Sequence, residues 1–241
     1  HPIPLSALAG DNVVTRSEKM GWYSGPTLIE LLESLSVYDD EHKAAFRFPV
    51  QLVARHNGHE ANDFRGYMGR VEAGTVHKGD VLVVQPSGHR ATVKDILTLD
   101  GSLESASAGK SITLLLDEYV DISRGDMLVS AEAPASLLKN FSADVCWLSE
   151  EPLDLGRKYW LKHTTRQVAA KVTSIDSLLD INTQQAESGT ELKLNGIARL
   201  RLTVQQALAA DSYDDMRSTG SFILIDEISH QTVAAGMIRI D

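Results

Sequence analysis

Near its start the chain carries a run of small residues whose types suit recognition of a nucleotide base. Ser6-Ala7-Leu8 is followed by Gly10-Asp11-Asn12-Val13. Small side chains let backbone N–H groups approach the edge of a planar base, and these donors match the carbonyl oxygen of guanine. Ser6 and Ala7 are therefore candidate guanine-contacting residues, and Leu8 belongs to the same candidate loop.

A second run imitates the end of a phosphate-binding loop without its context. Ala108-Gly109-Lys110-Ser111 ends as the pattern G-x-x-x-x-G-K-[ST] ends, but the position of the first glycine holds Glu104. The motif also needs a following helix whose N-terminus faces the phosphates, whereas Ile112–Leu116 is predicted to be a strand. We interpret the run as a hairpin turn.

The other reactive side chains do not assemble a catalytic or metal site by their spacing. His56 and His59 flank an Asn-Gly turn, and no third ligand stands at a convincing distance in the sequence. Adjacent carboxylates such as Asp214-Asp215 rarely converge on one target, and Arg124-Gly125-Asp126 is predicted to be a turn. The sequence predicts no catalytic residue and no metal ligand in this chain.

The charge balance disfavours an autonomous nucleic-acid binder. The 241 residues include 23 Lys and Arg against 33 Asp and Glu, a net charge of −10. Binding phosphates needs clustered cations, and the most basic segment, 157–166, is diffuse and predicted to be solvated surface. No apolar run approaches the about 20 residues that span a bilayer. The single cysteine, Cys146, fits a reducing compartment, and its neighbours Val145 and Trp147 predict that it is buried.

Periodic apolar residues predict one short helix followed by many strands. Leu28, Leu31, Leu32 and Leu35 share one helical face, just after Pro26. Apolar residues then alternate at 46, 48, 50 and 52, the period of a strand with one buried face. A helical turn is expected near 211–216. Further strands are predicted at Phe64–Glu72, Val81–Gln85, Thr92–Leu99, Ile112–Leu116, Met127–Val129, Phe141–Leu148, Lys158–His163, Val168–Ile175, Leu192–Val204, Phe222–Asp226 and Thr232–Ile240.

The spacing of these strands predicts the fold class and its division. Short strands separated by Gly-, Asn- and Pro-containing turns are typical of barrels and sandwiches. A break of small residues and proline at 131–135 separates two series of strands. The prediction is a mainly β protein with two consecutive β-barrels behind a short helical lead. The predicted boundaries are 1–42 for the lead and its linker helix, 43–133 for the first barrel and 134–241 for the second.

Several segments resemble the translation-factor-type GTPases. Ser6-Ala7-Leu8 is similar to the fifth guanine-nucleotide motif of that superfamily, and Trp22–Leu28 to the segment that leads into its two barrels, domains 2 and 3. Within the superfamily, the chain resembles the large, GTP-binding subunit of bacterial sulfate adenylyltransferase. The segments that carry this second resemblance are Arg47–Gln51, Asp63–Gly69, Pro86–Gly88, Asp121–Asp126, Lys162–Arg166, Ile181–Thr183, Leu194-Asn195, Thr219–Asp226 and Ala235–Ile238.

The resemblance implies a C-terminal fragment of a GTPase subunit. The phosphate loop, the Mg²⁺-linked motif and the base-reading Asn-Lys-x-Asp of the family precede the fifth motif and do not occur here. Residues 1–42 would then be the remnant of the GTPase domain. In the parent protein, Ser6 and Ala7 would contact guanine and Leu8 would pack behind them. GTP and Mg²⁺ would be cofactors of the parent, and none is expected in the fragment.

The resemblance also implies a partner and an activity. The parent would pair with a small catalytic subunit in the cytoplasm, and together they would convert ATP and sulfate into adenosine 5′-phosphosulfate and pyrophosphate. GTP hydrolysis would drive this uphill adenylation, with the barrels as coupling bodies between domains and subunits. The fragment alone is expected to be inactive, and neither nucleic acid nor a membrane is an expected partner.

Two alternatives to this interpretation remain. The chain could be the barrel part of an elongation-factor-like GTPase that contacts tRNA, although its acidic charge disfavours that role. It could also be a freestanding β-barrel interaction module.

Overall fold

The chain divides into two compact units, His1–Asp39 and Asp40–Asp241. The computed structural model describes residues 2–35, 43–56 and 64–240. Strands dominate these residues, as the sequence predicted. No helix in the described ranges is long and apolar enough to cross a membrane.

The first unit consists of turns and two short helices, the 3-10 helix η1 (Glu18–Met20) and α1 (Leu28–Ser34). The helix predicted from Leu28 is confirmed. Thr27 and Glu30 close its start reciprocally: Thr27 Oγ1 accepts from the Glu30 amide at 3.2 Å and the Glu30 carboxylate accepts from the Thr27 amide at 2.8 Å. This capping box satisfies donors that a helix otherwise leaves open. Leu32 and Leu35 of the apolar stripe remain half exposed.

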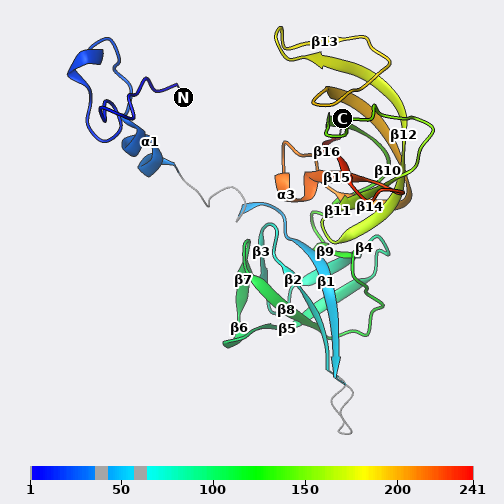
Figure 1. Cartoon of the computed structure of the whole chain (residues 1–241). Coiled ribbons are helices and arrows are strands. Elements are labelled where there is room, and N and C mark those ends of the chain that lie inside the picture. Colours follow the sequence, from blue (N-terminus) through cyan, green and yellow to red (C-terminus); the bar gives the residue numbers. More distant parts are fainter. Residues whose placement is uncertain (1, 36–42, 57–63, 241) are drawn as a thin grey trace. The chain divides into compact units, whose positions relative to one another are not determined.

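The second unit begins with a closed barrel (Figure 1). Six strands pair in the ring β4-β9-β1-β2-β8-β5-β4, and one further strand, β6, extends it beside β5. A small two-stranded sheet, β3-β7, accompanies the ring. The bounds are β1 (Arg47–His56), β2 (Phe64–Arg70), β3 (Thr75–His77), β4 (Val81–Gln85), β5 (Arg90–Thr98), β6 (Gly101–Leu103), β7 (Ser105–Ser107), β8 (Ser111–Leu116) and β9 (Met127–Ser130).

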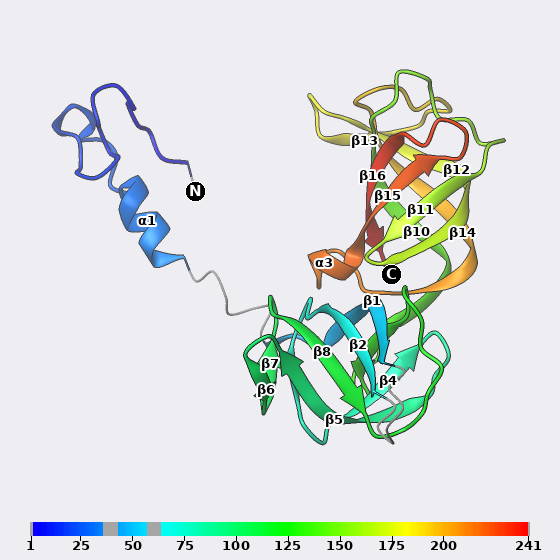
Figure 2. The same ribbon diagram turned by 60° about the horizontal axis from the view of Figure 1, so that its bottom comes forward.

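A second barrel follows after the connection at 131–135. Its ring runs β11-β15-β16-β10-β14-β12-β11, and β13 extends it beside β12. The short helix α3 (Arg217–Gly220) lies at the end of this barrel that faces the first (Figure 2). The bounds are β10 (Ser136–Trp147), β11 (Tyr159–His163), β12 (Arg166–Asp180), β13 (Gln185–Glu187), β14 (Ile197–Ala210), β15 (Ser221–Asp226) and β16 (Thr232–Arg239).

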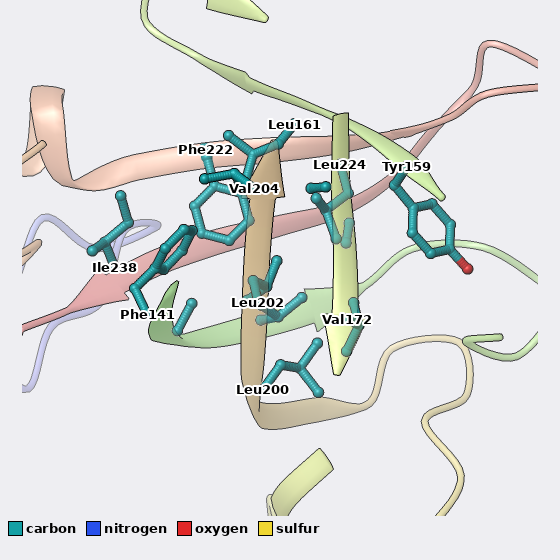
Figure 3. Close-up of a cluster of buried hydrophobic side chains, with 14 of the residues drawn as sticks. Phe141, Tyr159, Leu161, Val172, Leu200, Leu202, Val204, Phe222, Leu224 and Ile238 are labelled. Carbon is teal, nitrogen blue, oxygen red and sulfur yellow. The ribbon is translucent and has the colours of Figure 1, made fainter. Parts of the chain in front are cut away.

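Each barrel encloses its own apolar core, which strand alternation creates. In the second barrel, inward side chains from six strands meet, and Figure 3 shows Phe141, Phe222 and Ile238 pointing toward one another. Phe141 and Phe222 pack edge to face with their ring centroids 5.9 Å apart. In the first barrel, Phe46 and Phe48 stack with centroids 6.2 Å apart. The two-barrel fold class is therefore confirmed.

One detail of the predicted alternation was wrong, because β1 contains a β-bulge. The register between β1 and β2 shifts between Val50 and Leu52, so one extra residue stands in β1. Phe46, Phe48 and Val50 are buried as predicted, but Leu52 is 56% exposed. A bulge reverses the side on which later residues of a strand point. The sequence pattern contains no mark of this extra residue.

Cys146 is a second correction. Val145 and Trp147 are fully buried, as the sequence suggested, but Cys146 between them is only partly buried. The three residues belong to β10, where successive side chains point to opposite faces. Apolar neighbours in a strand therefore predict that the residue between them faces outward.

The boundaries of several elements also differ from the predictions. The strand predicted from Leu192 begins at Ile197, because residues 193–196 form a turn with Asn195 in the left-handed region at φ +62°. The strand β10 begins five residues before Phe141. Residues 213–215 form the turn expected near 211–216, and α3 follows it. The predicted turns at Gly109 and Gly125 are confirmed by positive φ angles of 90° and 94°.

Gly69 of β2 lies close to the backbone of β1, and its replacement tests the packing. A Cβ there would lie 2.5 Å from the Pro49 carbonyl oxygen and 2.9 Å from Phe48 Cζ. Gly69→Ala is expected to lower the free energy of unfolding by about 1–3 kcal/mol, because backbone must move. Gly66→Ala is the control, since its nearest obstacle is the movable Thr113 methyl group. Urea denaturation should show the larger loss for Gly69→Ala; equal losses would contradict this account.

Candidate functional site

The predicted guanine-contacting residues form a compact turn in the first unit. The Ser6 carbonyl accepts from the Gly10 amide at 2.8 Å, and Ser6 Oγ accepts from the Ala9 amide at 3.3 Å. Ser6 itself pairs with Asp11 through its amide. Within the described residues, no acceptor is bound to the amides of Ala7 and Leu8. Two adjacent N–H donors are therefore available at the tip of this turn.

Asn12 anchors the turn to the helix behind it. Its buried side chain donates to the Pro4 carbonyl at 2.8 Å and accepts from the Ser17 amide at 2.8 Å. The Asn12 backbone is left-handed at φ 57°, a conformation that asparagine tolerates. Its carbonyl accepts from the amide of Leu28, the first residue of α1, at 3.0 Å. The position of the Ser6–Gly10 turn is thus fixed from both sides.

The Leu8 side chain is fully exposed in this chain. Its expected packing behind the loop concerns the parent GTPase domain and stays a prediction. Ser6 is partly buried, and Ala7 and Ala9 are exposed. The side chains at the tip of this turn are therefore exposed together with its backbone.

A second candidate site is the junction of the two barrels, where a buried arginine joins them. Arg47, at the start of β1, is 3% exposed. Its Nε and Nη2 each donate to the Asp211 carboxylate at 2.8 Å, and Nη1 donates to the carbonyls of Phe46 and Ala133. Asp211 follows the last residue of β14. This bidentate pair aligns the first strand of one barrel with the end of a strand in the other.

The pair continues into the second barrel through Thr219 and His163. Thr219 Oγ1 donates to Asp211 at 2.6 Å, and the Thr219 carbonyl lies 2.7 Å from His163 Nε2. A carbonyl oxygen can only accept, so Nε2 carries the proton. His163 is buried, and this burial lowers the pKa of its imidazole, partly opposed by the Thr219 hydrogen bond. The imidazole is therefore neutral at pH 7.

A second ion pair joins the barrels, and here the arginine belongs to the second barrel and the aspartate to the first. Arg166 at the start of β12 donates to Asp126 of the first barrel at 3.2 Å, to the Gly125 carbonyl at 3.4 Å and to Gln206 at 3.1 Å. A Cβ on Gly125 would lie 3.2 Å from the Arg166 Cα, so glycine permits this approach. Arg166 is thus part of the barrel junction and not the solvated surface that its sequence context predicted.

Apolar packing seals the junction between these two arginines. Met127 and Val129 of β9 are buried against Ala135 and Ala209, with Val83 beside them. Gln85 donates from its amide to the Ala135 carbonyl at 2.8 Å. Both barrels belong to one compact unit. The junction therefore joins the two barrels through ion pairs, hydrogen bonds and apolar contacts.

Sequence reasoning missed the residues of this junction, although a signal was present. Arg47, Asp126 and Arg166 all lie in segments that carried the resemblance: Arg47–Gln51, Asp121–Asp126 and Lys162–Arg166. No local pattern relates them, because the partners are 164 and 40 residues apart. Within the described ranges, no three His, Cys, Asp or Glu side chains are grouped so that they could hold a metal ion. His59 lies outside those ranges.

Comparison with known proteins agrees with this architecture. Residues 140–239 match the family described as GTP-eEF1A C-terminal domain-like. Sulfate adenylyltransferase subunit 1 of Aliarcobacter butzleri is 44% identical over 98% of this chain and 50% of its own length. The same subunit of Vibrio vulnificus is 45% identical over 98% and 49%. The crystal structure of Sup35 complexed with GDP has a TM-score of 0.76 at 22% identity, over 98% of this chain and 58% of that one.

These similarities confirm the resemblance seen in the sequence. The match to Sup35 shows the fold alone, a translation-factor-like pair of barrels. The chain spans about half the length of the curated relatives it matches. Over 98% of its residues, the chain is therefore similar in sequence to about half of sulfate adenylyltransferase subunit 1.

Proposed function

We propose that the protein containing this chain is the GTPase subunit of a sulfate adenylyltransferase. Guanine-nucleotide hydrolysis by that subunit drives the reaction of ATP and sulfate to adenosine 5′-phosphosulfate and pyrophosphate, which a small catalytic subunit carries out in the cytoplasm. The observation that carries the proposal is 44% identity to sulfate adenylyltransferase subunit 1 over 98% of the chain. The chain's own role is coupling, and alone it is inactive.

The division of labour within the chain is part of the proposal. Residues 1–42 complete the GTPase domain, 43–133 form the first barrel and 134–241 the second; the first boundary lies outside the described residues. The open amides of Ala7 and Leu8 fit the carbonyl oxygen of guanine. The expected Mg²⁺ is assigned to no residue of this chain. The Arg47–Asp211 and Arg166–Asp126 pairs pass a displacement of one barrel to the other.

Pyrophosphate release by the full-length protein with its second subunit tests the function. Release should require sulfate and ATP, and should rise when GTP is added. Release that ignores sulfate, with tRNA bound to the purified protein, would contradict the proposal and favour the elongation-factor alternative. The chain of 241 residues alone should release no pyrophosphate; measurable turnover would contradict its coupling role.

A substitution in the Ser6–Gly10 turn tests guanine recognition. Ala7→Glu in the full-length protein is expected to raise the KM for GTP at least about tenfold with little change in kcat, because a carboxylate would face the guanine carbonyl. Ala9→Glu is the matched control, since Ala9 is also exposed but its amide is bound to Ser6 Oγ. Equal KM values for GTP in the two variants would show that Ala7 does not contact guanine.

A further inference from the structure

The outer face of the first barrel carries an apolar row where a solvated sheet should be polar. Leu52 of β1 pairs with Met68 of β2, Met68 with Thr113 of β8, and Thr113 with Leu97 of β5. Directly paired residues share one face of a sheet. Leu52 is 56% and Met68 38% exposed. The bulge in β1 is what turns Leu52 into this row.

The second barrel carries a corresponding row across five strands. Lys162 of β11 pairs with Ile223 of β15, Ile223 with Ala235 of β16, Ala235 with Cys146 of β10, and Cys146 with Ile197 of β14. Only Lys162, at the end of the row, is charged. An outward row of this composition lacks the polar residues that a water-facing strand normally shows.

The two rows line grooves that meet at the barrel junction. The groove over the first barrel has a volume of about 940 Å³ and includes Leu52, Met68 and Leu97. The groove over the second has a volume of about 640 Å³ and includes Lys162, Ile223 and Cys146. Thr164 and Ser218 line both grooves. The grooves are therefore neighbours at these two residues, and we name their combined lining the apolar strip.

The hairpin at the centre of the apolar strip holds an unfavourable conformation. Thr164 has φ +48°, which is rare for a β-branched residue. The Oγ1 atom of Thr165 is buried and has no hydrogen-bond partner within the described residues. The flanking residues His163 and Arg166 fix this hairpin through the junction network. Such strain persists where surrounding structure enforces it and concentrates at binding sites.

Charge indicates what covers the apolar strip. Lys162 makes no ion pair in the described part of the chain, whereas Arg70 in the first groove is paired with Glu72 at 3.0 Å. An occupant with apolar side chains and a carboxylate near Lys162 would complement this surface. A second copy placed symmetrically about Thr164 would bring two Lys162 side chains together, which like-charge repulsion opposes.

We propose that the apolar strip is the docking surface for the second subunit, a different polypeptide that presents apolar side chains and an acidic group. This inference rests on the proposed function, because the relatives' name, subunit 1, is what implies another subunit. Because the strip crosses the junction, the second subunit would contact both barrels at once. Docking there would sense any joint movement of the barrels.

Binding of the second subunit to full-length variants tests this surface. Leu52→Glu, Ile223→Glu and Lys162→Glu should each raise the dissociation constant at least tenfold in calorimetry, and Lys162→Arg should retain binding. Leu194→Glu is the matched control: Leu194 is 45% exposed but lies in a turn outside both grooves. Lys162 is exposed, so the effect of Lys162→Glu on binding still tests the surface if an apolar variant folds poorly.

The possible results separate the docking surface from the function. If the wild-type protein binds the second subunit and all groove variants bind equally well, the surface is wrong and the proposed function stands. If the wild-type protein does not bind the second subunit, the proposed function fails and the docking surface fails with it. If the variants instead change the protein's own oligomeric mass, a second copy is the occupant and the proposal is overturned.

Discussion

Arg47→Met is expected to lower the free energy of unfolding of this chain by about 3–5 kcal/mol. The substitution leaves the Asp211 carboxylate, whose side chain is 14% exposed, without its positive partner. It also removes the donor to the carbonyls of Phe46 and Ala133. A buried charge that loses its partner costs more than the pair contributed, because desolvation is no longer offset. Urea denaturation followed by circular dichroism measures the loss.

Arg201→Met is the matched control for Arg47→Met. Arg201 also pairs with an aspartate, Asp176, at 3.0 Å, but its side chain is 67% exposed. An exposed pair contributes only about 0–1 kcal/mol, so this variant should unfold almost as the wild-type chain does. Adding Asp211→Leu to Arg47→Met should recover part of the loss, because no unpaired charge then remains. Equal losses for the two single variants would show that the junction pair is not special.

The barrels were predictable because local patterns and turn chemistry agree along most strands. Phe46, Phe48 and Val50 alternate in sequence and face one core in the structure. The predictions that Leu52 and Cys146 are buried were wrong for two reasons. A bulge in β1 turns Leu52 outward, and Cys146 faces outward because it lies between two inward-facing residues of its strand. Apolar residues on an outer face look the same in sequence as apolar residues in a core. The apolar strip could therefore be identified only once the register of the strands was known.

The junction was not predictable, because its contacts join residues far apart in the chain. Arg47 stands between two buried phenylalanines, and alternation predicts that it points into solvent. It does point outward from its own barrel, but the second barrel covers it. The turn that is predicted to contact guanine was the opposite case. Its prediction came from a motif, and the structure adds the open amides of Ala7 and Leu8.

The neutral state of His163 makes the barrel junction sensitive to acid. Burial lowers the pKa of this imidazole; Asp211 opposes that shift and the positive charge of Arg166 adds to it. In the unfolded chain a histidine has a pKa of about 6.5. Below that pH the unfolded chain binds a proton that the folded chain does not bind. The contribution of His163 to the free energy of unfolding is therefore fully present above about pH 6.5 and falls as the pH drops. No partner for Nδ1 is recorded within the described residues, so a second N–H would be unsatisfied.

His163→Gln isolates this proton from the others. The glutamine amide can still donate to the Thr219 carbonyl, but it does not titrate. Between pH 6.5 and 5, the wild-type chain should lose stability more steeply than the variant, by up to about 1.4 kcal/mol per pH unit. Other carboxylates and histidines titrate in both proteins and cancel in the difference. Parallel profiles of the free energy of unfolding against pH would mean that the folded chain accommodates the charged imidazole. Diverging profiles would show an acid-sensitive contact beside Thr164, where the two grooves meet.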